Sequence, residues 1–154
     1  MCGIFGIFDS IHPLNPSAKV WAKQAQLLLR HRGPDGEKYI TLMDERCLLG
    51  HVRLAIIDLE GGAQPISNED GSIWVVCNGE IYNYVELREK LIALGHRFAT
   101  KSDTEVLVHL FEEKGSALLD DLQGMFAFAI VDTRKQRLFL ARDRFGEKPL
   151  YWAS

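Results

Sequence analysis

The sequence predicts an α+β fold in which helices cover antiparallel sheets. Strand-like apolar runs come in pairs around short polar turns, as at residues 38–43 and 47–59, which flank an acidic turn at 44–45. Two helical patterns follow one another directly, at residues 84–95 and 102–115. A parallel sheet would require strands and helices to alternate, so this order favours antiparallel hairpins with helices on their faces.

The chain begins with MCGIFGIF, in which Cys2 directly precedes a strand-like run. Chain termini are usually frayed. Four large apolar side chains in this run are expected to bury the terminus, namely Ile4, Phe5, Ile7 and Phe8. The thiol of Cys2 would then be held at a fixed position.

The remaining elements follow from local signals. Asn15 and Pro16 predict the start of a helix that ends near Arg30, where RHRGPDGE contains turn-forming pairs. The apolar stripe of this helix comprises Val20, Trp21, Ala25, Leu28 and Leu29. Ser102 and Glu105 have the spacing of a capping box at the start of the last helix. The further expected strands are IWVVCN, which ends at NGE, a hairpin over residues 125–143, and the short run PLYWA.

The composition is that of one globular domain. The chain has 154 residues, of which 47% are hydrophobic and 25% charged. A net charge of -3 and scattered basic residues argue against a nucleic-acid partner. The longest apolar runs are far shorter than the roughly 20 residues of a membrane-spanning helix. With no secretory signal visible, the expectation is a cytoplasmic protein without membrane contact.

The cysteines and histidines have no pattern of a metal site or a disulfide framework. Cys2, Cys47 and Cys77 are odd in number and have no CxxC spacing. The five histidines also have no ligand spacing, so no metal is expected. Cys47 and Cys77 lie in apolar runs and are expected to be small buried residues. Cys2 remains as the candidate reactive thiol.

Cys2 could carry both a nucleophile and a base. Removal of Met1 would leave a thiol and a free α-amine on one residue. A thiol with a pKa of about 8.5 needs a base to remove its proton. An α-amine with a pKa of roughly 7.7–8.0 is partly neutral at cytoplasmic pH and can act as that base. A nucleophile activated by its own terminal amine is a known catalytic arrangement. The alternative is that Cys2 merely follows the start codon and has no role.

Four further residues have the chemistry of an acyl-transfer site for an amino acid. Asn78 and Gly79 could donate hydrogen bonds to an oxyanion, although NG is also a turn signal. Arg53 could bind an α-carboxylate, or it could be the exposed side of a strand. Asp103 could bind an α-ammonium group, or it could complement a helix dipole.

Taken together, the motifs resemble a known family. They are MCGIFGIF, RHRGPDG, HVRLAIIDL, GAQP, NGEIYNY, KSDTEV, LQGMFAFAI and ARDRFGEKPLYW, in this order. The set resembles the N-terminal glutaminase domain of glutamine-dependent asparagine synthetases, which are class II amidotransferases of the N-terminal-nucleophile (Ntn) hydrolase type. The resemblance covers residues 1–154.

The resemblance implies a four-layer αββα sandwich and a set of roles. Cys2 would be the nucleophile and its amine the base, with Asn78 and the Gly79 N–H as the oxyanion hole. Arg53 and Asp103 would bind the α-carboxylate and α-amine of glutamine. The rest of the pocket would comprise Leu54, Ala55, Ile56, Ile57 and Glu80. Residues 30–36 resemble a loop that folds over glutamine, although a rigid turn is equally permitted.

The resemblance also implies partners. L-glutamine would be the substrate, and this half-reaction would need no metal or organic cofactor. In the family a second domain binds ATP and Mg²⁺ and receives the ammonia; its phosphate-binding motif is absent here, so the chain is expected to be the first domain of a longer protein. The ammonia acceptor stays open, as does a homodimer. The rival interpretations are an amidohydrolase using His31 or His51 as base, and a noncatalytic glutamine-sensing module.

Overall fold

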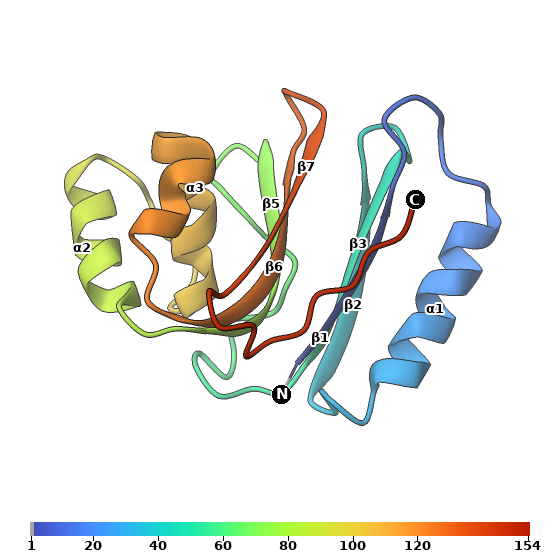
Figure 1. Cartoon of the computed structure of the whole chain (residues 1–154), viewed down its shortest axis with the longest axis horizontal. Helices are drawn as coiled ribbons and strands as arrows, with labels where there is room; N and C mark the ends of the chain where they lie inside the picture. Colours follow the sequence, from blue (N-terminus) through green and yellow to red (C-terminus); the bar gives the residue numbers. More distant parts are fainter. Residues whose placement is uncertain (1) are drawn as a thin grey trace.

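Two antiparallel sheets pack face to face between helices, which gives the four layers expected (Figure 1). The computed structural model describes residues 2–154. The first sheet has the order β1-β3-β2, with β1 at Gly3–Phe8, β2 at Gly36–Leu42 and β3 at Cys47–Arg53. The second has the order β4-β5-β6-β7, with β4 at Ile66–Ser67, β5 at Ile73–Ile81, β6 at Gly124–Asp132 and β7 at Arg137–Arg142.

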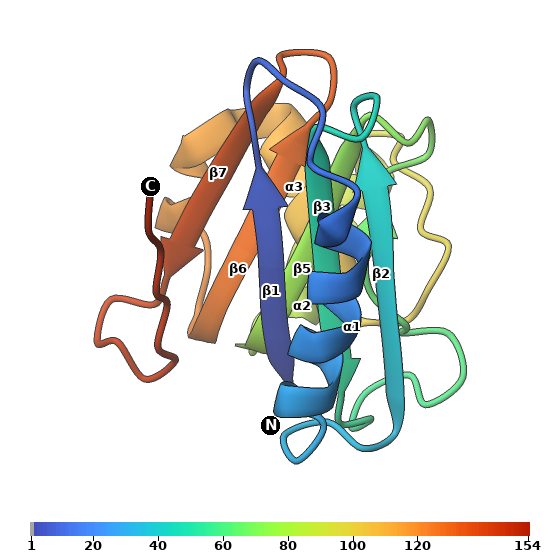
Figure 2. The same cartoon turned by 90° about the vertical axis from the view of Figure 1, so that its right-hand side faces the viewer.

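Helices cover the outer faces of both sheets. The helix α1 (Ser17–Leu29) lies across the first sheet (Figure 2), and α2 (Tyr84–Ala93) and α3 (Val106–Lys114) cover the second. Two 3₁₀ helices flank α3, η1 at Asp103–Glu105 and η2 at Gly115–Asp120. The α+β class and the hairpin order are therefore confirmed.

The core has two parts because strand side chains alternate between the two faces of a sheet. Between the sheets lie Cys47, Leu49, Val76, Ala129 and Val131, with Ile4 and Phe8 packed against them. Between the second sheet and its helices lies a larger apolar cluster that includes Val75, Cys77 and Phe128. Along β5, successive side chains therefore pack alternately between the two sheets and beneath the helices.

The predicted apolar stripe of α1 is only partly correct, because Trp21 packs against Phe5 and Leu29 lies against Gly3, but two of its members are mostly exposed. The buried residues of this helix are Ala18, Ala22 and Gln26, whereas Val20 is 58% exposed and Leu28 is 76% exposed. Small side chains let the helix approach the sheet closely, and Gly3 contributes to this approach. A Cβ at Gly3 would lie 3.0 Å from Val52 Cγ2 and 3.4 Å from Leu29 Cβ.

Several element boundaries differ from the sequence prediction. The strand expected over 47–59 ends at Arg53, because the segment that follows turns back toward the Arg53 side chain. The strand expected to end at NGE continues to Ile81, so NG lies inside β5 and forms no turn. PLYWA forms no strand, and the short β4 was not predicted.

The predicted capping box is half correct. Ser102 Oγ accepts a hydrogen bond from Thr104 N, as an N-cap should. Glu105 does not complete the box, because its carboxylate accepts instead from Ala99 N at 2.6 Å and Thr100 N at 2.7 Å. The first turn, η1, is a 3₁₀ helix, and α3 begins only at Val106.

Candidate active site

A cavity of about 70 Å³ opens where the ends of β3 and β5 meet η1 and the segment before β1. It brings together most of the residues predicted for the site. These are Cys2, Arg53, Leu54, Ile56, Ile57, Gly79, Glu80 and Asp103. Two sheets contribute to one cavity, since Arg53 belongs to the first sheet, Cys2 directly precedes its strand β1, and Gly79 belongs to the second sheet.

Cys2 is held by the backbone of the first sheet. The register pairs Gly3 with Val52, which places Cys2 beside the end of β3. Its Sγ accepts a hydrogen bond from Leu54 N at 3.3 Å, and its carbonyl accepts one from Arg32 Nε at 3.0 Å. The thiol is therefore fixed in place at the cavity, as the sequence predicts.

The other two thiols are not available for chemistry. Cys47 is fully buried, and burial raises the pKa of its thiol to about 12. Burial also raises the pKa of the Cys77 thiol well above its ordinary value. Because the thiolate is the attacking species, Cys2 is the only one of the three cysteines suited to act as a nucleophile at neutral pH.

The edge of β5 that is not paired with β6 directs a backbone donor toward the cavity. Cys77 N donates to Gln64 Oε1 at 2.6 Å and Ile81 N donates to Asp103 Oδ2 at 2.9 Å, both on the side away from β6. By the alternation of an antiparallel strand, the Gly79 N–H between them points the same way. Phe126, which pairs with Gly79 in the register, makes its backbone hydrogen bonds with Asp143: its N–H donates to Asp143 Oδ2 and its carbonyl accepts from Asp143 N.

Gly79 is required by the close approach of the neighbouring strand. A Cβ at this position would collide with the Met125 carbonyl oxygen and lie 2.6 Å from Phe126 Cα. Both are backbone atoms of β6, which cannot move aside as a flexible side chain could. Only glycine therefore fits at this point of the cavity wall.

Arg53 faces the cavity from the end of β3. Its guanidinium donates to the carbonyl oxygens of Ile57 at 3.1 Å, Asp58 at 2.5 Å and Leu59 at 3.0 Å. Gly62 leaves room for it, because a Cβ there would lie 2.7 Å from Arg53 Nη2. The loop after β3 thus fixes a positive charge in the cavity wall, which suits a carboxylate ligand.

Asp103 supplies the opposite charge. The residue is 6% exposed, and burial raises the pKa of its carboxyl, with the charge of Glu80 acting in the same direction. Hydrogen bonds from the backbone of Ile81 and Thr104 act the other way and offset this only in part. One wall of the cavity therefore has a carboxylate that a bound ammonium group would stabilise in its ionised form.

The two histidines proposed as alternative bases differ in position. His51 lines the cavity, whereas His31 does not and its Nδ1 lies 2.9 Å from Leu28 O. His51 is 1% exposed, and burial together with the charge of Arg53 lowers its pKa to about 4. An imidazole with such a low pKa is a weak base for a thiol whose ordinary pKa is about 8.5.

Two predicted site residues do not line the cavity. Asn78 is buried beside it, and its Oδ1 has no hydrogen-bond partner among residues 2–154. Ala55 lies outside, and its N–H donates to Asp35 Oδ2 at 2.9 Å. The predicted removal of Met1 concerns a residue outside those that the structure describes.

Residues 30–36 have the geometry of an anchored turn. Asp35 N donates to Arg53 O at 2.9 Å, and the Asp35 carboxylate accepts a hydrogen bond from Ala55 N, two residues beyond the end of β3. A Cβ at Gly33 would lie 2.5 Å from Arg53 N, so the turn packs directly on β3. None of these residues lines the cavity, and their described contacts favour the rigid-turn alternative.

Sequence reasoning missed six residues of the cavity wall: His51 as a wall residue, Gly62, Gln64, Ser102, Thr104 and Met125. Gln64 has the clearest structural role. Its Oε1 accepts from Cys77 N, and its Nε2 donates to Thr104 Oγ1 at 3.2 Å, which links β5 to η1. The motif GAQP was noted in the sequence, but its spacing carries no sign of this long-range contact.

A second group of polar side chains lies apart from this cavity. Glu69, His96, His109 and Glu112 could together hold a metal ion, and none of them lines the cavity. No metal is expected from the sequence alone, because the histidines lack ligand spacing. The local signal that could have been used is the pair His109 and Glu112, which lie one turn apart on α3.

No helix within residues 2–154 is long and apolar enough to cross a membrane.

The chain is similar to known proteins over its whole length. It matches the glutamine amidotransferase domain family over residues 1–154. It is 46% identical over 156 residues to asparagine synthetase [glutamine-hydrolyzing] 1 of Bacillus subtilis, covering 100% of this chain and 24% of that protein. It is 42% identical to asparagine synthetase B [glutamine-hydrolyzing] of Escherichia coli, covering 98% of this chain and 26% of that protein.

The fold is also found among solved structures. Glutamine phosphoribosylpyrophosphate amidotransferase from B. subtilis, complexed with ADP and GMP, superimposes with a TM-score of 0.68 at 24% identity. The superposition covers 91% of this chain and 37% of that one. The four-layer sandwich of the Ntn type is thereby confirmed as the fold. This chain spans about a quarter of the length of its curated relatives, and it belongs to the glutamine amidotransferase domain family.

Proposed function

We propose that this domain hydrolyses L-glutamine to glutamate and ammonia through a thioester on Cys2. The observation that carries the proposal is that one cavity combines a fixed thiol, a guanidinium and a buried carboxylate, from Cys2, Arg53 and Asp103. The two charged groups complement the α-carboxylate and α-ammonium of an amino acid. The thiol would then face the amide at the other end of the ligand.

The reaction has two steps. The Cys2 thiolate attacks the side-chain amide carbon of glutamine, and the tetrahedral oxyanion accepts a hydrogen bond from the Gly79 N–H, with Asn78 as a second candidate donor. The C–N bond breaks, ammonia leaves with a proton delivered by the base, and a γ-glutamyl thioester remains. Water then attacks the thioester, releases glutamate and restores the thiol. Each oxyanion donor of this kind contributes about 10²–10³-fold in rate.

We assign the role of base to the α-amine that Cys2 acquires when Met1 is removed. The competing base in the cavity is His51, whose pKa of about 4 leaves it neutral but weakly basic. An α-amine with a pKa of roughly 7.7–8.0 is much better matched to a thiol. His51→Gln should therefore reduce turnover far less than acetylation of the terminal amine does.

We also propose that the ammonia passes to a synthetase domain in the same protein. The supporting fact is that the curated relatives are glutamine-hydrolysing asparagine synthetases about four times as long as this chain. ATP and Mg²⁺ would be used by that other part, to amidate aspartate. Cys2, Cys47 and Cys77 are all free, which fits a reducing compartment such as the cytoplasm.

The proposal is tested by incubating the protein, with Cys2 as its first residue, with glutamine. Released glutamate is measured over time, and acid-quenched samples are examined by mass spectrometry for a γ-glutamyl adduct on Cys2. Both products are expected. A protein that binds glutamine but forms neither glutamate nor adduct would contradict hydrolysis at this site. Protein acetylated at Cys2 N is the control for the base, and it should bind glutamine but turn over poorly.

Acidification should weaken glutamine binding because Asp103 must be ionised to pair with the α-ammonium group. Its pKa is raised by burial, so KM should begin to rise at a higher pH than for an ordinary aspartate as the pH falls. Asp103→Asn should raise KM by about 30-fold at neutral pH, or ~2 kcal/mol. In that variant KM should lose its dependence on pH in the acid range.

Asp120→Asn is the matched control, since Asp120 is exposed and does not line the cavity. It should leave KM and its pH dependence unchanged. The role of Asp103 would be refuted if Asp103→Asn kept the acid-side rise of KM.

A further inference from the structure

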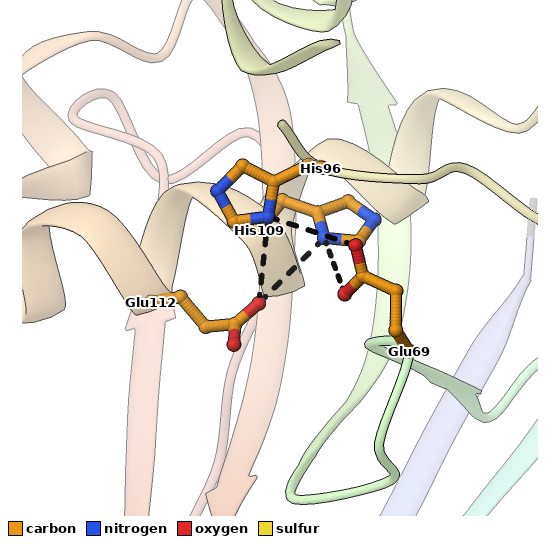
Figure 3. Close-up of side chains that lie close together, drawn as sticks. All are labelled: Glu69, His96, His109 and Glu112. Atoms are coloured by element: carbon orange, nitrogen blue, oxygen red, sulfur yellow. Dashed lines mark ion pairs between the residues drawn. The ribbon is translucent and has the colours of Figure 1, made fainter. Parts of the chain in front are cut away.

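We propose that Glu69, His96, His109 and Glu112 form a zinc site, hereafter the His₂Glu₂ cluster, separate from the glutamine cavity. The four side chains converge from three segments (Figure 3). Glu69 comes from the turn between β4 and β5, His96 from the loop after α2, and the other two from α3. This proposal is independent of glutamine hydrolysis.

The distances between histidine nitrogens and carboxylate oxygens are slightly longer than those around a tetrahedral ion, so small side-chain shifts would close the site. The Nδ1 atoms of both histidines lie 3.7 Å from Glu112 Oε2. Glu69 Oε2 lies 3.5 Å from His109 Nδ1, and Glu69 Oε1 lies 3.9 Å from His96 Nδ1. With bonds of roughly 2.0–2.1 Å to nitrogen and oxygen, the ligand atoms of tetrahedral zinc are about 3.4 Å apart. All four ligand atoms of the cluster lie within 4.8 Å of one another.

His109 supplies the independent sign that a ligand belongs here. Its side chain is 0% exposed, yet neither ring nitrogen has a hydrogen-bond partner among residues 2–154. Buried polar groups normally have partners. The carboxylate oxygens nearest to His109 Nδ1 stand at 3.5 and 3.7 Å, beyond ordinary hydrogen-bond length. An ion between them would satisfy His109 Nδ1 and both carboxylates together.

The outer nitrogens of both imidazoles also face carboxylates. His96 Nε2 lies 3.0 Å from Glu113 Oε1, and His109 Nε2 lies 3.6 Å from Glu105 Oε1. Zinc-bound histidines characteristically donate their other N–H to a carboxylate, which fixes the tautomer that presents the free nitrogen to the metal. Glu105 is itself held by the backbone of Ala99 and Thr100.

The geometry favours a structural site open to solvent on one side. The Glu69 carboxylate is oriented by Arg97 N, which donates to Oε1 at 2.6 Å. The side chains of Glu69 and Glu112 are 36% and 25% exposed, which leaves a path for the ion. Four protein ligands would complete a tetrahedron, as in structural zinc sites, and imidazole with carboxylate is a ligand set that zinc accepts. The ion would join the β4–β5 turn and the loop after α2 to α3.

The test is zinc binding to metal-free protein carrying Cys2→Ser, so that the accessible thiol cannot bind the ion. We expect one equivalent of Zn²⁺ per chain by competition with a chromophoric chelator, and a rise in Tm on addition of zinc. Co²⁺ should give the intense visible absorption of tetrahedral coordination. Glu112→Gln and His96→Gln should each weaken Zn²⁺ binding about tenfold or more.

Glu89→Gln and His12→Gln are matched controls on exposed positions outside the cluster, and both should bind Zn²⁺ like the parent. His109→Gln is not the main variant, because a change at a fully buried residue also alters folding stability; the side chains of His96 and Glu112 lie nearer the surface. The proposal is overturned if folded, metal-free protein binds no stoichiometric zinc, if Co²⁺ gives only weak octahedral absorption, or if His96→Gln and Glu112→Gln bind zinc as tightly as the controls. Any of these results would leave His96 and His109 as histidines paired with carboxylates without a metal.

Discussion

Replacing Cys2 by serine is expected to lower the rate of glutamate release by about 10⁴-fold or more. The thiol lines the cavity and is held by Leu54 N at 3.3 Å, so serine would occupy the same place with a much weaker nucleophile. Steady-state assays of glutamate release measure the loss. Mass spectrometry should show no γ-glutamyl adduct.

Glutamine binding shows whether the Cys2→Ser variant has lost only its chemistry or also its fold. Arg53 and Asp103 are unchanged, so calorimetry should give a Kd close to that of the parent. Cys47→Ser is the control for loss of a thiol outside the cavity, because Cys47 is fully buried and does not line it. If Cys2→Ser retained substantial turnover, a nucleophile other than this thiol would have to be sought.

Gly79→Ala is expected to destabilise the fold by about 3 kcal/mol and to abolish most of the activity. Its new methyl group would collide with the Met125 carbonyl and crowd Phe126 Cα at 2.6 Å. Both contacts are with the backbone of β6, so relief requires the two central strands to separate. That movement would also displace the Gly79 N–H from the cavity. Urea unfolding monitored by circular dichroism measures the first effect.

Gly115→Ala distinguishes backbone collision from ordinary glycine strain. Gly115 has a φ of 55°, but a Cβ there would meet nothing within 4 Å. Because its ψ is −133°, a conformation that side chains with a Cβ rarely adopt, replacement should cost about 1–3 kcal/mol through backbone strain alone and should leave activity intact. If Gly79→Ala kept the activity of the parent and lost no more stability than Gly115→Ala, the contact between Gly79 and β6 would not be the dominant effect.

The fold class was predictable because its signals are local. Paired apolar runs around short turns identify hairpins, and the long helical pattern after Ser102 identifies α3 despite its 3₁₀ start. The position of α1 on the sheet was not predictable in the same way. Its large apolar residues Val20 and Leu28 lie outside, while Ala18 and Ala22 form the contact, so hydrophobicity alone does not identify the buried face.

The site was predictable where motif residues carry the chemistry themselves. Cys2, Arg53 and Asp103 lie in one cavity, although their separate local patterns each allowed a simpler explanation. Gln64 escaped notice because its contribution is a pair of hydrogen bonds to distant segments. The His₂Glu₂ cluster escaped for the same reason, since Glu69 and His96 reach α3 only through tertiary folding.

The Cys2 thiol lies beside the first sheet, and the Gly79 N–H belongs to the second. Their relative position therefore depends on how the two sheets pack on the apolar layer between them, which includes Leu49 and Val76. A small sliding of one sheet over the other would change the distance between these two groups and so lower the turnover rate. A substitution that changes the volume of a side chain in that layer would therefore slow the reaction, although every residue that contacts glutamine is unchanged.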